Sequence, residues 1–423
     1  MSLAIEPSDY GRRVLRAQAA LEPRGAAAML VGVGPELEWL AGYPAVGHER
    51  LNLLVIPPSG PVTFIGPRLE LAAAEQAPGL SAAGVRLRPW AEGDDPYRLV
   101  PPLLAADAVL GPGAPPAPGT TPAPGFNPAL GTTPAPDLPP APGTTPAPRA
   151  GARFLISDSL RGAFVLGLQR VLPGATWGLA SEVLSPLRRV KDEPEIALLR
   201  AAARAADRVV ATVTRGPLIG RTEAEVAREV RERLVDEGHD RAEFATVASG
   251  PASASPHHEP DGRVIRAGEP LLLDIGGRLG GYCSDVTRTV WLAGVAGVAP
   301  DDRFREIYAL VEQAQSAGRA AVRPGVTFAA VDAAARSIIA AGGYAERFFH
   351  RLGHGIGLEV HEEPWVIEGN EELVAAGNTF SVEPGIYLEG RYGVRIEDAM
   401  LCTPDGGLAL NQAPRELTVV SGV

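Results

Sequence analysis

The sequence predicts two domains, an α/β domain followed by a domain of long helices and antiparallel hairpins. Its 423 residues exceed what one hydrophobic core usually organises. The first part alternates short apolar strands with helical stretches, which is typical of an α/β domain. The second part begins with amphipathic helices and continues with apolar strands joined by glycine-containing turns.

The N-terminal part contains the predicted α/β elements. Residues 9–22 predict a helix with Val14, Leu15 and Leu21 on one side. Residues 51–65, LNLLVIPPSGPVTFI, predict two strands around a Pro-Ser-Gly turn. Together they indicate a sheet with at least one covering helix.

A proline-rich segment at residues 112–148 interrupts this part. It repeats units such as PAPGTTPAP with a period of twelve residues. Proline removes backbone donors, and so few large apolar side chains cannot offset the entropy of ordering. We therefore expect an extended insertion without a core of its own.

The C-terminal part begins with helices. The run after residue 184 places apolar residues at helical spacing, namely Ile196, Leu199, Ala203, Ala206 and Val210. A second helix is predicted to start at Thr222, with Glu225 at the capping-box position and Gly238 after its end. Two further helices are expected at residues 302–322 and 328–343, before strands at 380–404.

Composition excludes several classes of protein. The net charge of −11 argues against nucleic-acid binding, which requires a basic surface. No apolar run reaches the 18 or more residues of a membrane span, and the N-terminus shows no secretory pattern, so we expect a cytoplasmic protein. The two cysteines, Cys283 and Cys402, are expected to be reduced and structural.

Two aspartates, Asp274 and Asp285, interrupt the apolar runs of a predicted hairpin at residues 271–292. A turn at residues 279–280 would place them directly opposite each other, and a turn at residues 278–279 would make them diagonal neighbours on one face. A loop with an odd number of residues would separate them. Carboxylates that are buried or lie opposite each other destabilise the fold unless a cation binds them. The alternative is that both aspartates lie on the solvent-exposed face of the hairpin, where no cation is needed.

A second hairpin repeats the arrangement with Glu383 and Glu397, which flank a turn near Gly390. A three-residue loop there would set the two glutamates face to face. Between the two hairpins lies His354, whose neighbouring glycines leave room for a close approach. Four carboxylates and one imidazole suit two divalent cations of the manganese, cobalt or zinc type.

These segments, LLLDIG, SDVTRT, GHGIGLEVHE, SVEPGIY and VRIEDAM, resemble those of the pita-bread metallopeptidases, most of all the Xaa-Pro dipeptidases (prolidases) and Xaa-Pro aminopeptidases. The stretches WLAGY and LLVIP are similar to a creatinase-type N-terminal domain. The resemblance implies an α/β creatinase-like domain at residues 1–179, carrying the insertion, and an α+β pita-bread catalytic domain with a curved antiparallel sheet at residues 180–423. It also implies a homodimer.

The resemblance further implies a dinuclear metal centre. Asp274 would bind one ion, Asp285 and Glu397 would bridge both, and His354 and Glu383 would complete the shells. Manganese is the expected metal, with cobalt or zinc as alternatives. A hydroxide held between the two ions would attack an Xaa-Pro peptide bond.

The same resemblance implies catalytic groups around the metals. Glu383 would take and return a proton. His257, with His258 as the alternative, and His361 would contact the oxyanion or the leaving nitrogen. Arg395 matches an arginine beside the bridging glutamate and is expected on the substrate side.

Specificity residues are expected at both ends of the substrate. Tyr282 and Trp365 would form an apolar wall for the proline ring. Glu36 and Glu38 could pair with the free amine, although solvated surface charge is the more common role of such residues, as it is for Arg50. Similar microbial prolidases have a carboxylate-binding arginine where this chain has Trp365. Groups that could replace this arginine are Arg391, Arg395 and Arg50.

Alternative functions follow from the same residues. The missing arginine favours an Xaa-Pro aminopeptidase that acts on longer peptides, whereas the string GHGIGLEVHE resembles the dipeptidase form. A creatinase-like hydrolase without metal and a pita-bread binding protein are further alternatives, but such proteins usually lack several of the carboxylates. The sequence thus favours an Xaa-Pro dipeptidase.

Overall fold

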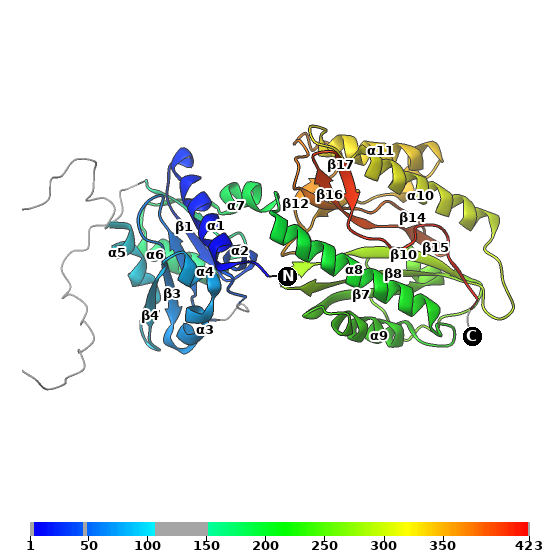
Figure 1. Cartoon of the computed structure of the whole chain (residues 1–423), viewed down its shortest axis with the longest axis horizontal. Coiled ribbons are helices and arrows are strands. Elements are labelled where there is room, and N and C mark those ends of the chain that lie inside the picture. Colours follow the sequence, from blue (N-terminus) through cyan, green and yellow to red (C-terminus); the bar gives the residue numbers. More distant parts are fainter. Residues whose placement is uncertain (1–3, 45–48, 106–150, 422–423) are drawn as a thin grey trace, which may run out of the picture. The chain divides into compact units, whose positions relative to one another are not determined.

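The computed structural model describes residues 4–44, 49–105 and 151–421. They form two compact units, one of residues 7–184 and one of residues 4–6 and 185–421, both drawn in Figure 1. The division falls within helix α7, Ser181–Arg188. The predicted domain bounds, 1–179 and 180–423, stay a prediction, and the proline-rich insertion at 112–148 lies outside the described residues.

The N-terminal unit is built on a mixed six-stranded sheet in the order β4-β3-β2-β1-β5-β6. The strands are β1 (Ala26–Gly32), β2 (Leu53–Ile56), β3 (Thr63–Pro67), β4 (Arg86–Trp90), β5 (Arg153–Ile156) and β6 (Thr176–Leu179). The helices are α1 (Pro7–Ala19), α2 (Pro35–Ala41), α3 (Leu71–Gln76), α4 (Pro78–Ala82), α5 (Val100–Ala105), α6 (Gly162–Val171) and α7. Parallel and antiparallel neighbours occur together, as expected for an α/β unit with short connections.

Two local predictions for this unit have different outcomes. The strand pair predicted at residues 51–65 is confirmed, because β2 and β3 pair antiparallel. The predicted apolar face of the first helix is partly wrong. Val14 is buried and Leu21 is buried after the helix end, but Leu15 is 66% exposed. Successive helical residues lie 100° apart, so the burial of Val14 turns Leu15 toward solvent.

The described part of the C-terminal unit contains four long helices and three groups of strands, which pair antiparallel except for the parallel pair of β10 and β18. The helices are α8 (Glu193–Arg215), α9 (Glu223–Asp236), α10 (Asp302–Ala321) and α11 (Phe328–Ala341). One sheet has the order β18-β10-β8-β7 with β9 attached to β8, another β12-β11-β13-β16-β17, and β14 pairs with β15. The strands are β7 (Arg241–Ser249), β8 (Glu269–Leu279), β9 (Tyr282–Cys283), β10 (Val286–Leu292), β11 (Gly353–Gly355), β12 (Glu362–Val366), β13 (Thr379–Val382), β14 (Gly385–Leu388), β15 (Tyr392–Arg395), β16 (Asp398–Thr403), β17 (Gly406–Ala409) and β18 (Val419–Val420).

The helices of this unit lie on opposite sides of the strands. Figure 1 shows the strands between α8 and α9 on one side and α10 and α11 on the other. One apolar core joins α8 and α9 to β7, β8 and β10, and a second joins α10 and α11 to the strands from β12 onward. The strands between the two helix pairs are thus held on both sides, which fixes the side chains that they carry.

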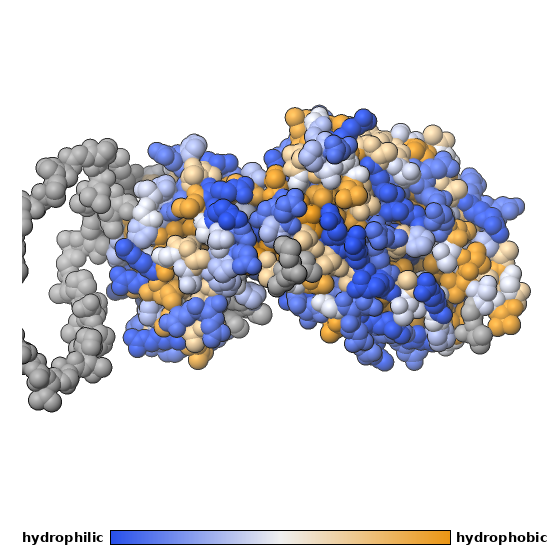
Figure 2. Space-filling model, in the orientation of Figure 1, coloured by the Kyte–Doolittle hydropathy of each residue, from blue (hydrophilic) through white to orange (hydrophobic). Residues whose placement is uncertain are grey.

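The predicted helices of the C-terminal unit are confirmed. All five apolar residues predicted for the first helix are buried in α8. Thr222 and Glu225 form the capping box of α9, and Gly238 follows its end with φ of +105°. The outer faces of α8 and α9 carry exposed charged residues such as Arg208 and Arg228, and Figure 2 shows hydrophilic side chains gathered over these helices. Among the described helices, none has both the length and the apolar composition of a membrane span.

Candidate active site

The first hairpin places Asp274 and Asp285 as diagonal neighbours on one face. Its turn is Gly280-Gly281, with φ of +56° and +88°, and Leu279 pairs with Tyr282. Only glycine accepts two successive positive φ values readily, so this pair of residues takes the turn. Asp274 consequently pairs with Thr287. Both predicted turn positions were wrong by one or two residues, but the even loop length preserved the shared face.

The second hairpin sets Glu383 opposite Glu397, as the three-residue loop predicted. β14 and β15 pair Gly385 with Arg395 and leave residues 389–391 as the loop. β13 and β16 pair Val382 with Asp398 in the same register. Glu383 and Glu397 lie between these two pairs of strands and belong to neither pair. Pro384, which follows Glu383, has no N–H to donate to a strand hydrogen bond.

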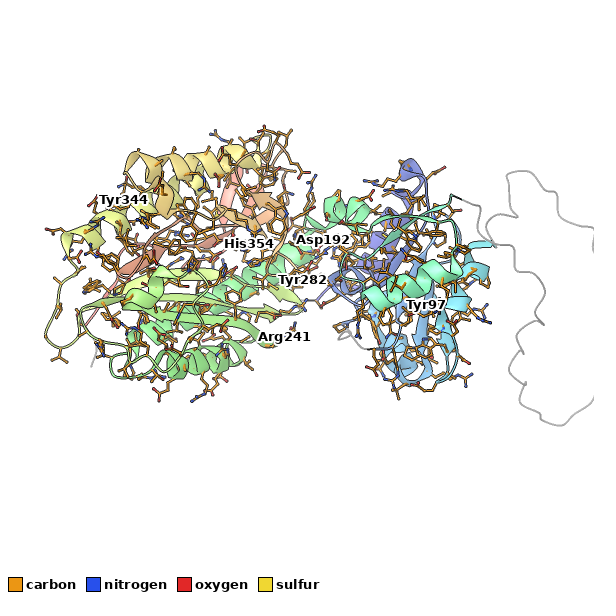
Figure 3. The ribbon with its side chains drawn as sticks, turned by 180° about the vertical axis from the view of Figure 1, so that it is seen from behind. Tyr97, Asp192, Arg241, Tyr282, Tyr344 and His354 are labelled. Atoms are coloured by element: carbon orange, nitrogen blue, oxygen red, sulfur yellow. The ribbon has the colours of Figure 1, made fainter. Side chains whose placement is uncertain are left out.

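One cavity of about 710 Å³ brings the predicted polar residues together. All five predicted metal ligands line it: Asp274, Asp285, His354, Glu383 and Glu397. His354 Nε2 lies 3.3 Å from Glu383 Oε1 and 3.6 Å from Asp285 Oδ2. Figure 3 labels His354 among the strands of the C-terminal unit. The cavity size is typical of a small-ligand site.

Three buried carboxylate oxygens in this cavity have no hydrogen-bond partner among the described residues. They are Asp274 Oδ1, Asp285 Oδ1 and Glu397 Oε1. Asp285, His354 and Glu397 also each offer a ligand atom within 4.8 Å of the others. Buried, unpaired carboxylate oxygens are costly unless a cation binds them, so the residues present fit a divalent metal centre.

The opposite oxygens of these carboxylates are held by neighbouring side chains. Thr287 Oγ1 donates to Glu397 Oε2 at 2.7 Å. Arg395 Nη2 donates to Asp274 Oδ2 at 2.6 Å, and Arg395 Nη1 donates to the Tyr387 hydroxyl at 2.9 Å. In Asp274 and Glu397 one carboxylate oxygen is therefore held by a hydrogen bond while the other has no partner among the described residues, as expected for oriented metal ligands.

The electrostatics of the cavity favour cation binding. Burial first, and then the neighbouring carboxylates, raise the pKa of Asp285 and of Glu397 well above the usual range. Burial also raises the pKa of Asp274 in spite of the adjacent Arg395 charge. These raised pKa values mean that the clustered carboxylates bind protons readily when no metal is present. A divalent cation would take the place of these protons.

Glu383 differs from the other three carboxylates. Burial opposes its ionisation, but the hydrogen bond with His354 and the nearby charges of His354 and Arg395 lower its pKa to about 2. Its carboxylate is therefore ionised at neutral pH. Ser381 Oγ donates to Glu383 Oε1 at 3.2 Å and fixes its orientation.

Two predicted catalytic histidines also line the cavity. The His361 and His354 rings have centroids 4.1 Å apart. Desolvation, followed by the charges of His354 and Arg351, lowers the pKa of His361 to about 4, so this ring is neutral at pH 7. His257, which was expected on the substrate side, is exposed and lines the cavity.

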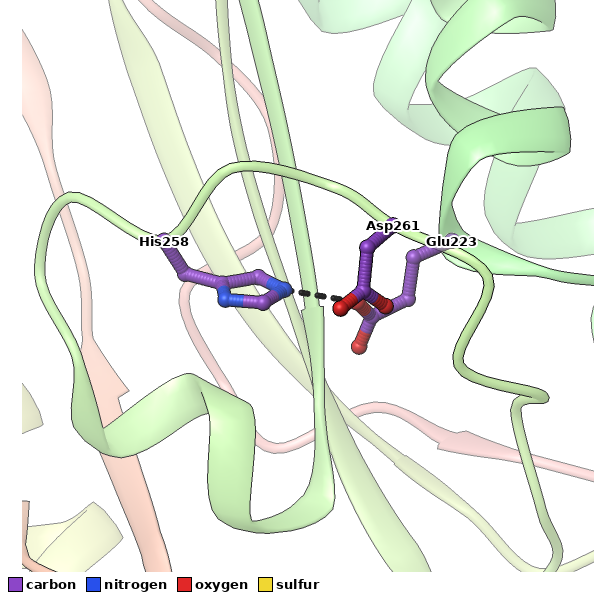
Figure 4. A group of neighbouring side chains, drawn as sticks. All are labelled: Glu223, His258 and Asp261. Carbon is purple, nitrogen blue, oxygen red and sulfur yellow. Dashed lines mark hydrogen bonds and ion pairs between the residues drawn. The ribbon is translucent and has the colours of Figure 1, made fainter.

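His258 is held by a different contact. Its Nε2 lies 2.6 Å from Glu223 Oε2, as Figure 4 shows together with Asp261. The backbone N–H and the hydroxyl of Ser249 donate to Glu223 Oε1, so both oxygens of this buried carboxylate have partners. The pair of Glu223 and His258 thus forms a hydrogen-bonded anchor for the loop that presents His257.

The predicted aromatic wall is wrong. Tyr282 does not line the cavity; it is buried and donates to Glu195 Oε1 of α8 at 2.7 Å. Figure 3 places it near Asp192, at the start of that helix. In the observed register Tyr282 lies on the sheet face opposite Asp285, which explains the difference.

Trp365 does not line the cavity either. It pairs with His354 across β11 and β12, and its ring lies under the Arg351 guanidinium at 4.3 Å from the centroid. The aromatic residues that do line the cavity are Phe244 and Phe349. The sequence around Phe244 and Phe349 gives no signal for a place in the cavity, because the pairing of strands and loops decides it.

The remaining predicted substrate residues have other surroundings. Glu36 is buried in α2 of the N-terminal unit, where Glu38 also lies, and their contact with a substrate amine stays a prediction. Arg50 pairs with Glu92 in the same unit. Arg391 lies on the β14–β15 loop over the Tyr392 ring and does not line the cavity. Arg395 does line it, but its donors bond Asp274, Tyr387 and Thr287.

Comparison with known proteins agrees with this site. Residues 197–404 match metallopeptidase family M24, and residues 13–111 match the Creatinase/Prolidase N-terminal domain. The probable dipeptidase PepE of Mycobacterium bovis is 42% identical over 97% of this chain and 96% of its own length. The chain belongs to metallopeptidase family M24.

Further relatives of this M24 peptidase carry more specific names. The Xaa-Pro dipeptidase of Pyrococcus horikoshii is 36% identical over 62% of this chain and 74% of its own length. The crystal structure of a recombinant prolidase from Thermococcus sibiricus has a TM-score of 0.81 and 32% identity, and covers 97% of this chain and 99% of that chain. The predicted creatinase-type and pita-bread domains are thereby confirmed, as is the prediction of a metallopeptidase.

Proposed function

We propose that this M24 peptidase hydrolyses Xaa-Pro dipeptides with two divalent cations, manganese in the first place, held by the five cavity residues. The observation that carries the proposal is the meeting of four carboxylates and His354 in one cavity, with three carboxylate oxygens left without partners. The names of the relatives, dipeptidase and Xaa-Pro dipeptidase, support the substrate class.

The cations would be held by Asp274, Asp285, His354, Glu383 and Glu397. When bound, they supply Lewis acidity for the peptide carbonyl and lower the pKa of a water molecule. The other contributions come from the side chains of the chain itself. Thr287 and Arg395 orient the carboxylates, and the strand ladders on both sides of Glu383 and Glu397 keep these two in place.

Proton transfer is assigned to Glu383. Glu383 lines the cavity and is ionised at neutral pH, so it can take the proton of an attacking water molecule whose own pKa the bound cations would lower. It then returns the proton to the proline nitrogen, which carries no hydrogen in an Xaa-Pro bond and must gain one to leave as an amine. The neutral His361, with His257 on the nearby loop, donates hydrogen bonds to the developing oxyanion.

The cavity also provides apolar surface for a proline ring. Phe349 is 64% exposed beside Tyr387, with ring centroids 5.4 Å apart, and Phe244 lines the same cavity. These rings replace Tyr282 and Trp365 as the candidates for the proline wall. A ring-shaped apolar surface without an acceptor suits a tertiary amide, which has no N–H to donate.

The test compares three peptides with the full chain loaded with Mn²⁺. We expect Ala-Pro to be cleaved, Ala-Ala to be cleaved at least about tenfold more slowly, since the proline ring contacts would be lost, and Ala-Pro-Ala to be a poor substrate. Cleavage of Ala-Pro-Ala alone would show an Xaa-Pro aminopeptidase instead. Activity that persists in thoroughly metal-free protein would contradict the metal-dependent mechanism.

A further inference from the structure

Lys191 and Glu362 form a buried ion pair that the mechanism above does not use. The exposed fraction of Lys191 is 5% and that of Glu362 is 8%, and the Lys191 Nζ lies 2.6 Å from Glu362 Oε1. Arg188 Nη2 donates to Glu362 Oε2 at 2.7 Å, so each carboxylate oxygen has a cationic partner. Burial opposes ionisation, but the charges of Lys191 and Arg188 lower the pKa of Glu362. Glu362 is therefore an ionised carboxylate that two cations hold inside the protein.

Glu362 directly follows His361, which the mechanism above places at the oxyanion. His361 lines the cavity and Glu362 does not, because successive side chains point to opposite sides where strand β12 begins. The Glu362 carboxylate also accepts a hydrogen bond from the backbone N–H of Glu359, and a Cβ atom at Gly357 would lie 2.6 Å from Glu362 Oε1. The carboxylate thus packs against the backbone of the loop between β11 and β12, residues 356–361, which ends in His361.

The His361 ring depends on this loop for its orientation. Within the described part of the chain, no group forms a hydrogen bond with the ring, which contacts the His354 ring edge-on at an interplanar angle of 76°. A ring without a hydrogen-bond partner is oriented by its packing and by the backbone that carries it. The position of the loop therefore decides whether a ring N–H of His361 reaches the developing oxyanion.

Net stability alone does not account for the buried pair. Taking two charges out of water costs about as much as their attraction returns, so a buried ion pair is weak evidence for stability. An exposed pair joins the same two parts of the chain, Arg189 with Glu372, and such surface pairs also contribute little. The buried pair differs because its partners cannot separate without leaving an unpaired charge in the interior. It therefore holds the loop in one position.

We propose that the buried ion pair of Lys191 and Glu362 positions His361 for the peptidase reaction. Neither member of the pair lines the cavity, so both act through the loop that ends in His361 and not by touching the substrate. A displacement of about 1 Å in a catalytic group can lower a rate about 100-fold. This inference rests on the proposed peptidase function and adds the residues that hold its oxyanion donor in place.

The test measures the hydrolysis of Ala-Pro by the Mn²⁺-loaded full chain. We expect Lys191→Met, which removes the charge but keeps a long side chain, to lower kcat about 10- to 100-fold and to leave KM within about twofold, because the oxyanion contact forms only in the transition state. In a His361→Ala background the same substitution should lower kcat by less than about twofold, since the residue through which it acts is absent. Losses of equal size with and without His361 would overturn the proposal, as would a metal-loaded Lys191→Met enzyme with normal kcat.

Matched variants separate this role from general damage. Arg189→Ala breaks the exposed ion pair with Glu372 and should change neither kcat nor KM. The metal content of Lys191→Met should equal that of the wild type; a lower content would assign the loss to metal binding and overturn the role of His361.

A second variant covers the case in which Lys191→Met does not fold. Arg188→Ala removes the cation whose side chain is 11% exposed and leaves Lys191 on Glu362. Its kcat should fall by a smaller factor, and only while His361 is present; a normal kcat, or an equal fall without His361, would overturn the proposal. A metal-loaded wild type that does not cleave Ala-Pro would overturn the peptidase proposal and this inference with it, whereas the other outcomes overturn the inference alone.

Discussion

Thr287 Oγ1 donates a 2.7 Å hydrogen bond to Glu397 Oε2, and the other oxygen of the same carboxylate is buried without a partner among the described residues. The two residues are 110 positions apart and come from different hairpins. The contact therefore ties the two halves of the candidate metal centre together. It also fixes which oxygen of Glu397 faces the cavity.

Thr287→Val tests this relationship, because valine has nearly the same shape without the hydroxyl. We expect the affinity for Mn²⁺ to fall about 10- to 100-fold, the usual effect of removing a group that orients a metal ligand. Isothermal titration of the metal-free protein measures it. Thr287→Ser retains the hydroxyl and should bind Mn²⁺ nearly as the wild type does; equal affinities for all three proteins would contradict the role of this hydrogen bond.

Glu383→Gln tests proton transfer at a residue that is also a proposed metal ligand, so the activity is compared at full metal occupancy. The amide cannot accept the proton, so we expect kcat for Ala-Pro to fall about 10²- to 10⁴-fold. Steady-state kinetics at saturating Mn²⁺ measure this change. Glu389→Gln makes the same charge change at an exposed position of the β14–β15 loop and should retain full activity. A Glu383→Gln enzyme with normal kcat would exclude Glu383 as the proton carrier.

The pH dependence of stability should differ between metal-free and metal-loaded protein. Burial and like charge raise the pKa of Asp285 and Glu397 in the folded state. Their protonated forms therefore stabilise the metal-free fold at low pH, and this contribution is lost as the pH rises through the raised values. With Mn²⁺ the ligands must be deprotonated, so acid should weaken binding and lower the stability.

Thermal unfolding between pH 5 and pH 8, with chelator or with Mn²⁺, checks this sign. Asp285→Asn mimics the protonated carboxyl, so the metal-free variant should lose less stability with rising pH than the wild type does. Identical pH profiles of the two metal-free proteins would show that Asp285 does not carry the raised pKa.

Tyr282→Phe tests the correction to the aromatic wall. Removing the hydroxyl leaves the buried Glu195 Oε1 without this donor, so we expect the free energy of unfolding to fall by about 1–3 kcal/mol. Because Tyr282 faces α8 instead of the cavity, kcat/KM for Ala-Pro should not change. A higher KM with unchanged denaturant stability would restore Tyr282 as a specificity residue.

The sequence was sufficient to predict which of the expected ligands share a face of a hairpin, because this depends on local spacing. The face shared by Asp274 and Asp285 depends only on an even loop length, and the opposition of Glu383 and Glu397 only on a three-residue loop. The first turn lies one or two residues beyond its predicted positions because the successive glycines 280 and 281 both accept positive φ.

The surroundings of the ligands could not be predicted in the same way. Tyr282 faces away from Asp285 because the turn position sets the register, and the stacking of Arg351 on Trp365 depends on how β11 and β12 pair. The contact of Arg395 with Asp274 joins residues 121 positions apart. Such contacts follow from tertiary packing, which no local pattern encodes.

Metal binding at equilibrium is the most direct test of the central claim that the buried carboxylates form a dinuclear centre. The full chain, dialysed against saturating Mn²⁺ and analysed by atomic emission, should retain two ions, and Glu397→Gln should lose at least one of them together with activity. Full activity with one ion or none would contradict the account.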